Sequence, residues 1–336
     1  MPRPRDVEPK PFFWIALKEE PQRSAPKFHD TFRGWTGQLD IEIEVHSDYL
    51  YVGSGQIELV RLSNGQEQAR YAFTRRNGQL IIPGTSIKGA VRAVFEAITN
   101  SCVRIVAKAT KSRGQIIKPD ERPWFKPGQR FATWAACNSI EKLCPACRVF
   151  GTTGYRGRVY FTDAEPVDDT RTDTIKISEL WPPRRTKGRK FYETKAFPQR
   201  DPEHSIRFLE VARGGEKFRT TLRFENLSEA ELGALIRALG ININAGQIDN
   251  VFPIKLGGAK PRCLGSVYFL PKQVRIIASP HQSWLQGVIQ PGGKGALVQH
   301  LTTWLADTSL LDQAAWERFR EKAQPRTDEP CPREVY

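Results

Sequence analysis

Residues 77–92, NGQLIIPGTSIKGAVR, join a short apolar run to a helical pattern through a Pro-Gly turn. We interpret Leu80 to Ile82 as the end of a buried strand. Pro83 and Gly84 break that strand because proline lacks an amide donor and glycine permits a positive φ. The apolar residues that follow recur at helical spacing, so a helix is expected from Ile87 to about Ile98.

The start of this helix has the composition of an anion site. Thr85 or Ser86 is expected to cap it, and Lys88 and Arg92 follow within two turns. Free backbone N–H groups and the positive end of the helix dipole attract phosphate. The pattern therefore predicts phosphate contacts from these four residues, with a capped helix carrying two solvated bases as the alternative.

A second glycine-rich stretch, residues 255–266, reads KLGGAKPRCLGS and precedes an apolar strand at 267–270. Glycines allow a backbone to approach a ligand closely, and three cations suit a phosphate chain. We expect contacts from Lys255, Gly257, Gly258, Lys260 and Arg262; a bare structural hairpin is the alternative. The spacing fits neither the Walker nor the dinucleotide-binding pattern, which argues against a mononucleotide ATPase.

In this order, the two stretches resemble the RAMP superfamily of CRISPR-associated proteins. In that family an IPG-S-x-KG-x-R turn precedes the first helix, and a GG-x-K-x-R-x-LG loop precedes the last core strand. Residues 29–37 (HDTFRGWTG) and 144–151 (CPACRVFG) are similar to the backbone subunits of type III effector complexes, most of all type III-D. The resemblance runs from about residue 28 to 270. It implies a subunit that binds crRNA and complementary target RNA in antiviral defence, beside other RAMP-type subunits and a large subunit.

The composition independently points to a polyanionic partner. The 336 residues carry a net charge of +14, with a pI near 9.6, and nucleic acid is the commonest partner of so basic a chain. A membrane-surface protein is the competing interpretation, but no basic amphipathic helix supports it. The sequence has no long apolar run and no secretory signal, so we expect a cytoplasmic protein.

The chain has six cysteines, and in a cytoplasmic protein disulfides are not expected. Cys144 and Cys147 form a C-x-x-C knuckle, with Cys102 and Cys137 upstream. Four thiolates satisfy a tetrahedral structural zinc site. A redox-active C-x-x-C pair is the alternative, although it belongs at a helix start in a thioredoxin-like unit, which the pattern does not indicate. The remaining two, Cys263 and Cys331, are expected to be unpaired.

The order of predicted elements gives an α+β fold class, with a ferredoxin-like, RNA-recognition-type βαββαβ core. The core is expected at residues 28–282, with a zinc-bearing insertion at about 100–151 and a basic, thumb-like insertion at 165–215. Strict alternation marks strands at 38–45 and 217–224, the latter with one apolar and one basic face. A capping box at 228–231 opens a helix that ends near Leu239.

We expect two C-terminal helices within 283–323 and a disordered tail at 324–336. Residues 1–27 are expected to form an extended arm, packing either on a neighbour or on this chain.

The 165–215 insertion contains a stretch, residues 181–192, that mixes bases with aromatic side chains. Bases contact phosphates and aromatic rings stack on nucleobases. Arg184, Arg185, Lys187 and Arg189 are therefore further predicted RNA contacts, and a solvated loop is the alternative. By the resemblance alone, this insertion is the thumb that pushes into the guide–target duplex.

RNA cleavage by this subunit is not predicted. Cleaving members of the family carry an aspartate in the loop after the first strand, where it acts with a divalent metal such as Mg²⁺. Here the loop, residues 53–79, is expected to be polar and rich in turns, and its only acids are Glu58 and Glu67. Asp30 and Asp48 lie just outside it and remain the catalytic candidates, with turn or surface roles as the alternative. An endoribonuclease acting on target RNA or guide precursor is the rival hypothesis, and a zinc-dependent DNA-binding factor is a third that lacks the expected motifs.

Overall fold

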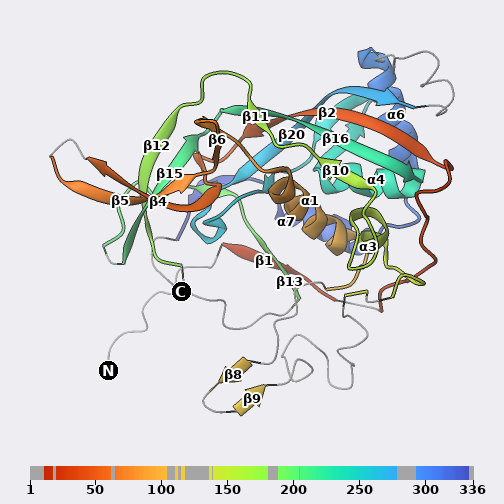
Figure 1. Cartoon of the computed structure of the whole chain (residues 1–336), viewed down its shortest axis with the longest axis horizontal. Helices are drawn as coiled ribbons and strands as arrows, with labels where there is room; N and C mark the ends of the chain where they lie inside the picture. The colour runs from red at the N-terminus through yellow and green to blue at the C-terminus, as the bar shows by residue number, and fades with distance from the viewer. Residues whose placement is uncertain are drawn as a thin grey trace.

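The computed structural model describes residues 11–17, 20–61, 65–103, 110–112, 115–117, 136–137, 139–180, 188–203, 205–277 and 293–332. Figure 1 shows the long strands β2, β16 and β20 crossing the upper part of the molecule, with helix α1 below them. These strands form the central sheet, on which the candidate functional surfaces are built.

The central sheet is antiparallel throughout, in the order β10-β16-β2-β20-β19. Its strands are β2 (Trp35–Val45), β10 (Val159–Phe161), β16 (Lys217–Leu227), β19 (Ile254–Lys255) and β20 (Ser266–Ile276), and β11 (Glu165–Pro166) also pairs with β16. Alternation buries one face, as at Leu39, Ile41 and Ile43, each 0% exposed.

Two helices cover the buried face of this sheet. These are α1 (Gly84–Ile98) and α4 (Glu229–Ala238), which contact each other. The chain order β2, α1, β10, β16, α4, β20 is the predicted strand-helix-strand-strand-helix-strand succession. The predicted α+β class with an antiparallel sheet is therefore confirmed. The predicted capping box is also present, since Ser228 and Glu231 each accept from the other's backbone N–H.

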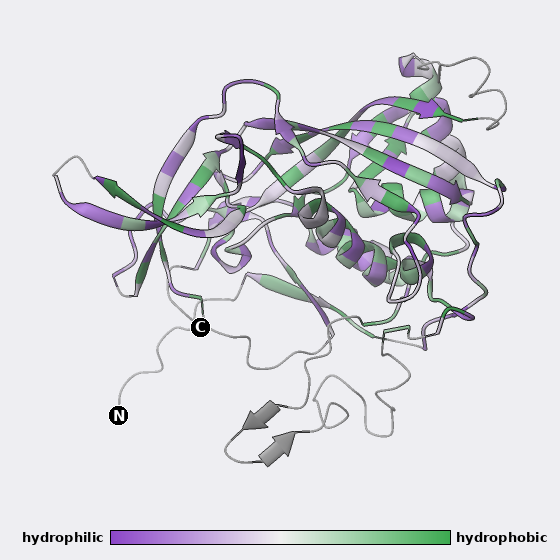
Figure 2. Cartoon of the chain, in the orientation of Figure 1, coloured by the Kyte–Doolittle hydropathy of each residue, from purple (hydrophilic) through white to green (hydrophobic). Residues whose placement is uncertain are grey.

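Helix α1 packs as its sequence period demands, with Ile87, Val91 and Phe95 fully buried. Figure 2 shows apolar and polar residues alternating around it. Gly84 lies so close to β10 that a Cβ there would stand 2.1 Å from the Phe161 carbonyl oxygen. The glycine of the Pro-Gly turn is thus required by helix–strand packing.

A second sheet runs in the order β12-β15-β5-β4, and β3 also pairs with β15. Its strands are β3 (Tyr49–Leu50), β4 (Gly53–Arg61), β5 (Glu67–Phe73), β12 (Thr172–Ser178) and β15 (Ile206–Arg213). The prediction of a turn-rich loop over residues 53–79 is therefore wrong, because most of it is the β4–β5 hairpin, which projects to the left in Figure 1. Parts of the predicted thumb-like insertion, 165–215, belong to the same sheet.

Glu210 on β15 holds this second sheet together. Its side chain is 1% exposed and accepts from the guanidinium groups of Arg70 and Arg75 and from the Phe73 amide. Burial raises the pKa of the carboxyl, but the Arg75 hydrogen bond, the Phe73 amide and the charges outweigh it, so its pKa lies below the ordinary value.

Replacing Glu210 with glutamine is expected to cost about 3 kcal/mol of unfolding free energy, because two arginines lose a buried partner. The cost should be full at neutral pH. It should shrink as pH falls below the unfolded pKa of about 4.3 and through the lower folded pKa, because the wild-type carboxylate is then also neutralised. Urea unfolding at several pH values measures it, with the exposed Glu67→Gln as control. A Glu210→Gln protein as stable as wild type at pH 7 would contradict this role.

Shorter elements complete the part of the chain that the structure describes. Two-stranded pairs are β1 (Phe12–Ile15) with β13 (Arg189–Tyr192), β6 (Arg75–Arg76) with β7 (Gln79–Leu80), β8 (Thr110–Ser112) with β9 (Gln115–Ile117), β14 (Lys195–Ala196) with β21 (Arg326–Pro330), and β17 (Ile241–Asn244) with β18 (Gln247–Asn250). The remaining helices are α3 (Pro145–Phe150), a 3-10 turn (Lys260–Arg262), α6 (Lys294–Ala306) and α7 (Gln313–Lys322).

Both ends of the described chain pack on its own body. Strand β1 pairs with β13, and Lys190 lies 4.0 Å from the Phe12 ring centroid, so the alternative of an arm folded on its own chain holds for residues 12–15. The prediction of two C-terminal helices matches α6 and α7. The prediction of a disordered tail is wrong for residues 326–332, because β21 pairs with β14 and Cys331 is buried.

Cys331 also forms a disulfide with Cys263, with an S–S distance of 2.04 Å. The prediction that these two cysteines are unpaired is therefore wrong. They are 68 residues apart in sequence, and no local pattern signals their pairing. The disulfide ties the C-terminal strand to the second glycine-rich stretch.

Candidate nucleic-acid interface and metal centre

The four predicted ligand cysteines come together in the fold. Cys102, Cys137, Cys144 and Cys147 are buried, and their sulfur atoms all lie within 4.8 Å of one another. Cys144 directly precedes α3, so Cys144 and Cys147 face the same point from one turn of backbone. Cys102 lies a few residues beyond the end of α1, which brings the distant ligand to the pair.

The donor set and its spacing fit zinc. A Zn–S bond of about 2.3 Å implies an S···S edge of about 3.8 Å in a tetrahedron, and the Cys102 and Cys147 sulfurs are 3.6 Å apart. Backbone amides support the sulfurs: the Cys144 amide donates to Cys137 Sγ at 3.3 Å, and the Cys102 amide to Cys144 Sγ at 3.5 Å. A bound ion would crosslink the end of α1 to the start of α3.

Two arginines that we predicted as RNA contacts instead belong to this centre. Arg92 donates to Glu96 at 2.6 Å, to the Gly151 carbonyl at 2.7 Å and to Cys147 Sγ at 3.5 Å. Arg189 donates to the Ser101 carbonyl and lies 3.6 Å from Glu96. Four thiolates around Zn²⁺ carry two net negative charges, which these guanidinium groups offset.

The start of α1 differs from the predicted anion site. The prediction that Thr85 or Ser86 caps the helix is wrong. The N-cap residue is Pro83, and the helix has no side-chain N-cap hydrogen bond. The first helical amide, of Gly84, donates instead to the Asp163 carboxylate at 2.8 Å. Asp163 also pairs with Arg76 at 3.0 Å, so a carboxylate already occupies part of this terminus.

The second glycine-rich stretch folds back on the chain itself. A Cβ at Gly257 would lie 2.1 Å from the Tyr51 carbonyl oxygen, and the Gly258 amide donates to that oxygen at 2.8 Å. Lys255 Nζ donates to the Cys263 and Leu264 carbonyls at 3.0 and 3.2 Å. Burial, with a smaller effect of the Lys260 charge, lowers the pKa of Lys255 to about 7. Arg262 is 4% exposed and donates to backbone carbonyls. Lys255 and Arg262 therefore brace this turn.

The two stretches nevertheless lie near each other. The Tyr51 carbonyl binds the 255–265 turn, and the next carbonyl, of Val52, accepts from the Thr74 amide at 2.8 Å. The Thr74 carbonyl then accepts from Ile81 at 2.9 Å, just before α1. The segment at 51–52 thus connects both turns. Arg184, Arg185 and Lys187 of the predicted thumb lie outside the described residues.

A basic surface that we did not list among the sequence candidates lies on the open face of the central sheet. On β16, the alternation leaves Arg219 and Arg223 exposed, and within the described residues neither is in an ion pair. Arg223 is paired across the strands with Tyr160 on β10. Lys88 and Arg156 approach the Tyr160 ring, with their charged groups 5.1 and 5.3 Å from its centroid. The basic alternation at 217–224 was the sequence signal for this surface.

The two catalytic candidates, Asp30 and Asp48, are both exposed and have different structural roles. Asp48 Oδ2 accepts from the Phe197 amide at 2.7 Å, which makes it a connector between β3 and the segment after β14. Asp30 lies in a turn of the segment before β2. Asp48 and Asp201 line one cavity beside β12, but within the described residues neither catalytic candidate is hydrogen-bonded to a histidine.

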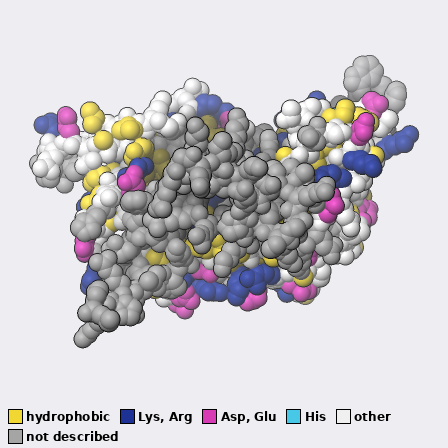
Figure 3. Space-filling model, turned by 90° about the horizontal axis from the view of Figure 1, so that it is seen from below, with side chains coloured by type: hydrophobic (Ala, Val, Ile, Leu, Met, Phe, Trp, Pro, Cys, Tyr) yellow, Lys and Arg dark blue, Asp and Glu magenta, His cyan; other side chains and the backbone are white. Residues whose placement is uncertain are grey.

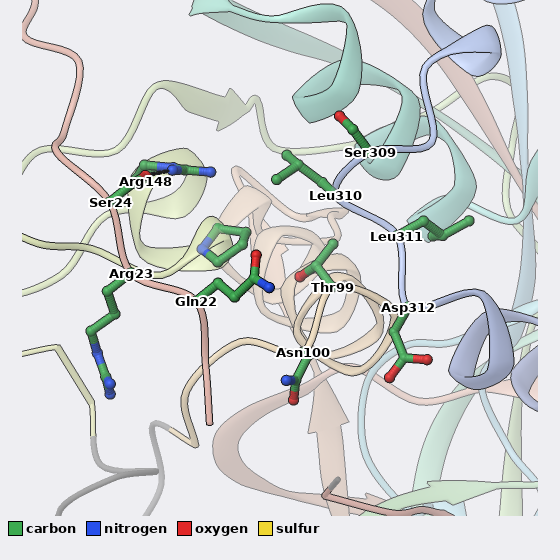
Figure 4. A pocket seen from close by; sticks show the side chains of 11 residues that line it. Gln22, Arg23, Ser24, Thr99, Asn100, Arg148, Ser309, Leu310, Leu311 and Asp312 are labelled. Carbon is green, nitrogen blue, oxygen red and sulfur yellow. Dashed lines mark hydrogen bonds between the residues drawn. The ribbon is translucent and has the colours of Figure 1, made fainter. Parts of the chain in front are cut away.

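A polar cavity of about 450 Å³ lies between residues 22–24, the end of α1 and the segment before α7 (Figure 4). Arg148 lines it, but its guanidinium donates to Ser24 and lies 3.6 Å from Glu231. Figure 3 shows basic and acidic side chains intermixed over the described part of the lower face. Neither the cavity nor the lower face therefore presents a basic surface like that of β16.

Comparison with family models identifies a family for this chain. The model of the RAMP superfamily matches residues 42–267, about two thirds of the chain. No curated protein is similar enough to be matched. Within the described residues, no helix has the length and apolar character needed to cross a membrane.

Proposed function

Since this chain belongs to the RAMP superfamily, which indicates a CRISPR-associated RNA-binding subunit, we propose that it is a backbone subunit of a type III effector complex, most like type III-D. In this role it holds the crRNA backbone and organises the guide–target duplex for antiviral defence. Its partners are crRNA, complementary target RNA, other RAMP-type subunits and the large subunit, in the cytoplasm.

The open basic face of the central sheet carries this proposal. In the second sheet, most exposed arginines are in ion pairs, as Arg213 is with Asp173 and Arg207 with Glu179. Arg219 and Arg223 are exposed on one face of β16 and are in no ion pair within the described residues. A polyanion that crosses β16 can pair with both guanidinium groups and release counterions.

The proposed RNA contacts are therefore redrawn from the sequence prediction. Arg92, Arg189, Lys255 and Arg262 are left out, because their side chains bind this chain. The amide of Gly258 is also left out, because it donates to the Tyr51 carbonyl. Thr85, Ser86, Lys88, Lys260 and the backbone of Gly257 remain, as do the thumb bases Arg184, Arg185 and Lys187. Arg219 and Arg223 are added.

The proposal assigns no cleavage to this subunit, because residues 53–79 contain no aspartate. Zinc is assigned a structural role at the four cysteines, and Mg²⁺ none. Complementary RNA incubated with the assembled complex and Mg²⁺ should stay intact opposite this subunit. A cut there that disappears in Asp30→Ala or Asp48→Ala would replace the proposal with the endoribonuclease.

Direct binding tests the function. Purified protein freed of nucleic acid should bind fluorescent single-stranded RNA of unrelated sequences with similar affinity, measured by anisotropy. Affinity should fall steeply with salt, with a slope of about −0.7 per phosphate contact in a log–log plot. Absent binding, or binding indifferent to salt, would contradict it.

A further inference from the structure

The turn that leads into β2, residues 28–34, exposes two aromatic side chains. Phe28 and Phe32 are 54% and 38% exposed, whereas Phe218 and Phe224 on β16, the strand beside β2, are 0% and 1% exposed. A single exposed apolar residue needs no explanation, but two phenylalanine rings within five residues place a large apolar area in water. Such an area marks a surface on which a partner binds.

The backbone of this turn is fixed by contacts with the body of the protein. Asn226, at the end of β16, donates to the Thr31 carbonyl at 2.5 Å and accepts from the Arg33 amide at 2.8 Å. At the other end of the turn, the Tyr155 hydroxyl donates to the Lys27 carbonyl at 2.5 Å. Because the backbone is already ordered, a ligand that covers the two rings restricts only side chains, which favours binding.

The turn lies beside the basic surface of β16. His29 Nδ1 and Glu225 Oε2 are 2.9 Å apart. The burial alternation of β16 places Glu225 on the same face as Arg223, and two residues along a strand span about 7 Å. A nucleic-acid strand that contacts Arg223 is therefore within reach of the turn.

The charges around the two rings favour nucleic acid over protein as the partner. Residues 27–34 hold the bases Lys27 and Arg33 against one acid, Asp30. Arg33 is exposed and is in no ion pair within the described residues, and the nearby Glu225 carboxylate is offset by Arg156 at 3.4 Å. Proteins bind single strands with aromatic rings that stack on bases and with cations that contact phosphates, and this turn carries both groups.

We infer that Phe28 and Phe32 stack on nucleobases of an unpaired stretch of the RNA that crosses β16. This inference deepens the RNA-binding proposal and rests on it, because it adds base contacts to the phosphate contacts of Arg219 and Arg223. Every base has a π-face, so stacking here raises affinity with little selection of sequence. Paired bases are already stacked within a duplex, so the turn should contact single-stranded nucleotides.

A strand without bases tests this inference. Fluorescent single-stranded RNA is compared by anisotropy with an abasic ribose-phosphate strand of the same length, which keeps the phosphates and lacks the rings. Wild-type protein freed of nucleic acid should bind the RNA about tenfold more tightly than the abasic strand. Phe28→Ala with Phe32→Ala should lose this preference and bind both strands alike. The salt dependence of RNA binding should keep its slope, because no phosphate contact is lost.

Matched variants separate stacking from apolar contact and from misfolding. Phe28→Tyr with Phe32→Tyr keeps both rings and should retain the preference for RNA, whereas Phe28→Leu with Phe32→Leu keeps the apolar bulk and should lose it. Ile206→Ala removes an exposed apolar side chain from β15 and should leave binding unchanged. Circular dichroism checks that each variant is folded, as expected at exposed positions.

The outcomes distinguish this inference from the function on which it rests. If wild-type protein binds both strands equally and with a steep salt dependence, stacking is rejected and the RNA-binding proposal stands. If it binds neither strand, both are rejected. An alanine variant that keeps the preference for RNA but no longer enters the assembled complex would show that the turn contacts protein, and leucine variants that bind as wild type would show a general apolar contact. Either result overturns stacking.

Discussion

Replacing Cys144 with serine is expected to unfold the protein at 37 °C. Cys144 is the central member of the cysteine cluster: its sulfur accepts from the Cys102 amide, its own amide donates to Cys137 Sγ, and its carbonyl begins α3. A structural zinc site contributes about 10–16 kcal/mol of coupled folding free energy in small domains. Even part of that matches the whole stability of a typical domain, about 5–15 kcal/mol.

Metal analysis and thermal melting measure this effect together. Wild-type protein should hold about one zinc per chain and lose its cooperative transition when a strong chelator removes the metal. Cys331→Ser is the control for metal content: it also replaces a buried cysteine, but one that is disulfide-bonded to Cys263, so it should retain the zinc. Metal-free protein of unchanged stability would contradict the zinc site, and a Cys144–Cys147 disulfide in such protein would favour the redox alternative.

Cys144 and Cys147 were predictable because their C-x-x-C spacing is local. Cys137 and Cys102 were chosen because they lie upstream in the same region, and the fold brings them to the pair. The central sheet was predictable for a similar reason, since strict alternation at 38–45 and 217–224 allows one face to be buried. For the C-x-x-C pair and for these strands, neighbouring residues carry the signal.

Charged side chains were less predictable because a sequence shows a charge without its partner. Arg92 looked like a phosphate ligand, yet Glu96 lies one helical turn further on and binds it at 2.6 Å. That pair has the i, i+4 spacing, which is readable in advance. Nothing local marks Arg262, whose acceptors are the backbone carbonyls of Pro332 and Glu179, 70 and 83 residues away.

The β4–β5 hairpin was missed for a different reason. Glycines at 53 and 55 suggested turns, and an apolar face directed at solvent does not give the usual strand pattern of a buried face. Arg70 on β5 pairs with the distant Glu210, a contact that local periodicity does not report. The same long-range character hid the Cys263–Cys331 disulfide and the pairing of β21.

Replacing Arg219 and Arg223 together with glutamine is expected to weaken RNA binding by roughly tenfold or more at low salt. Both residues are exposed on the open face of β16 and have no ion-pair partner among the described residues, and Arg223 is paired across the strands with Tyr160. Each lost phosphate contact should lower the steepness of the log–log salt dependence by about 0.7, so the double variant loses about 1.4. The effect should be the same for unrelated RNA sequences, because phosphate contacts carry no sequence information.

The matched control lowers the net charge by the same amount, at two positions on the C-terminal helices. Lys294 at the start of α6 and Arg320 on α7 are both exposed. Lys294→Gln with Arg320→Gln should shift affinity only slightly, through the long-range field, and should keep the wild-type slope. If both double variants lose the same slope, RNA binds through net charge alone and β16 has no special part. If neither loses it, the RNA path does not cross the open sheet face. A loss confined to Arg219 and Arg223 places the phosphate chain across β16, which is the arrangement that the alternation of exposed bases and buried apolar residues on this strand favours.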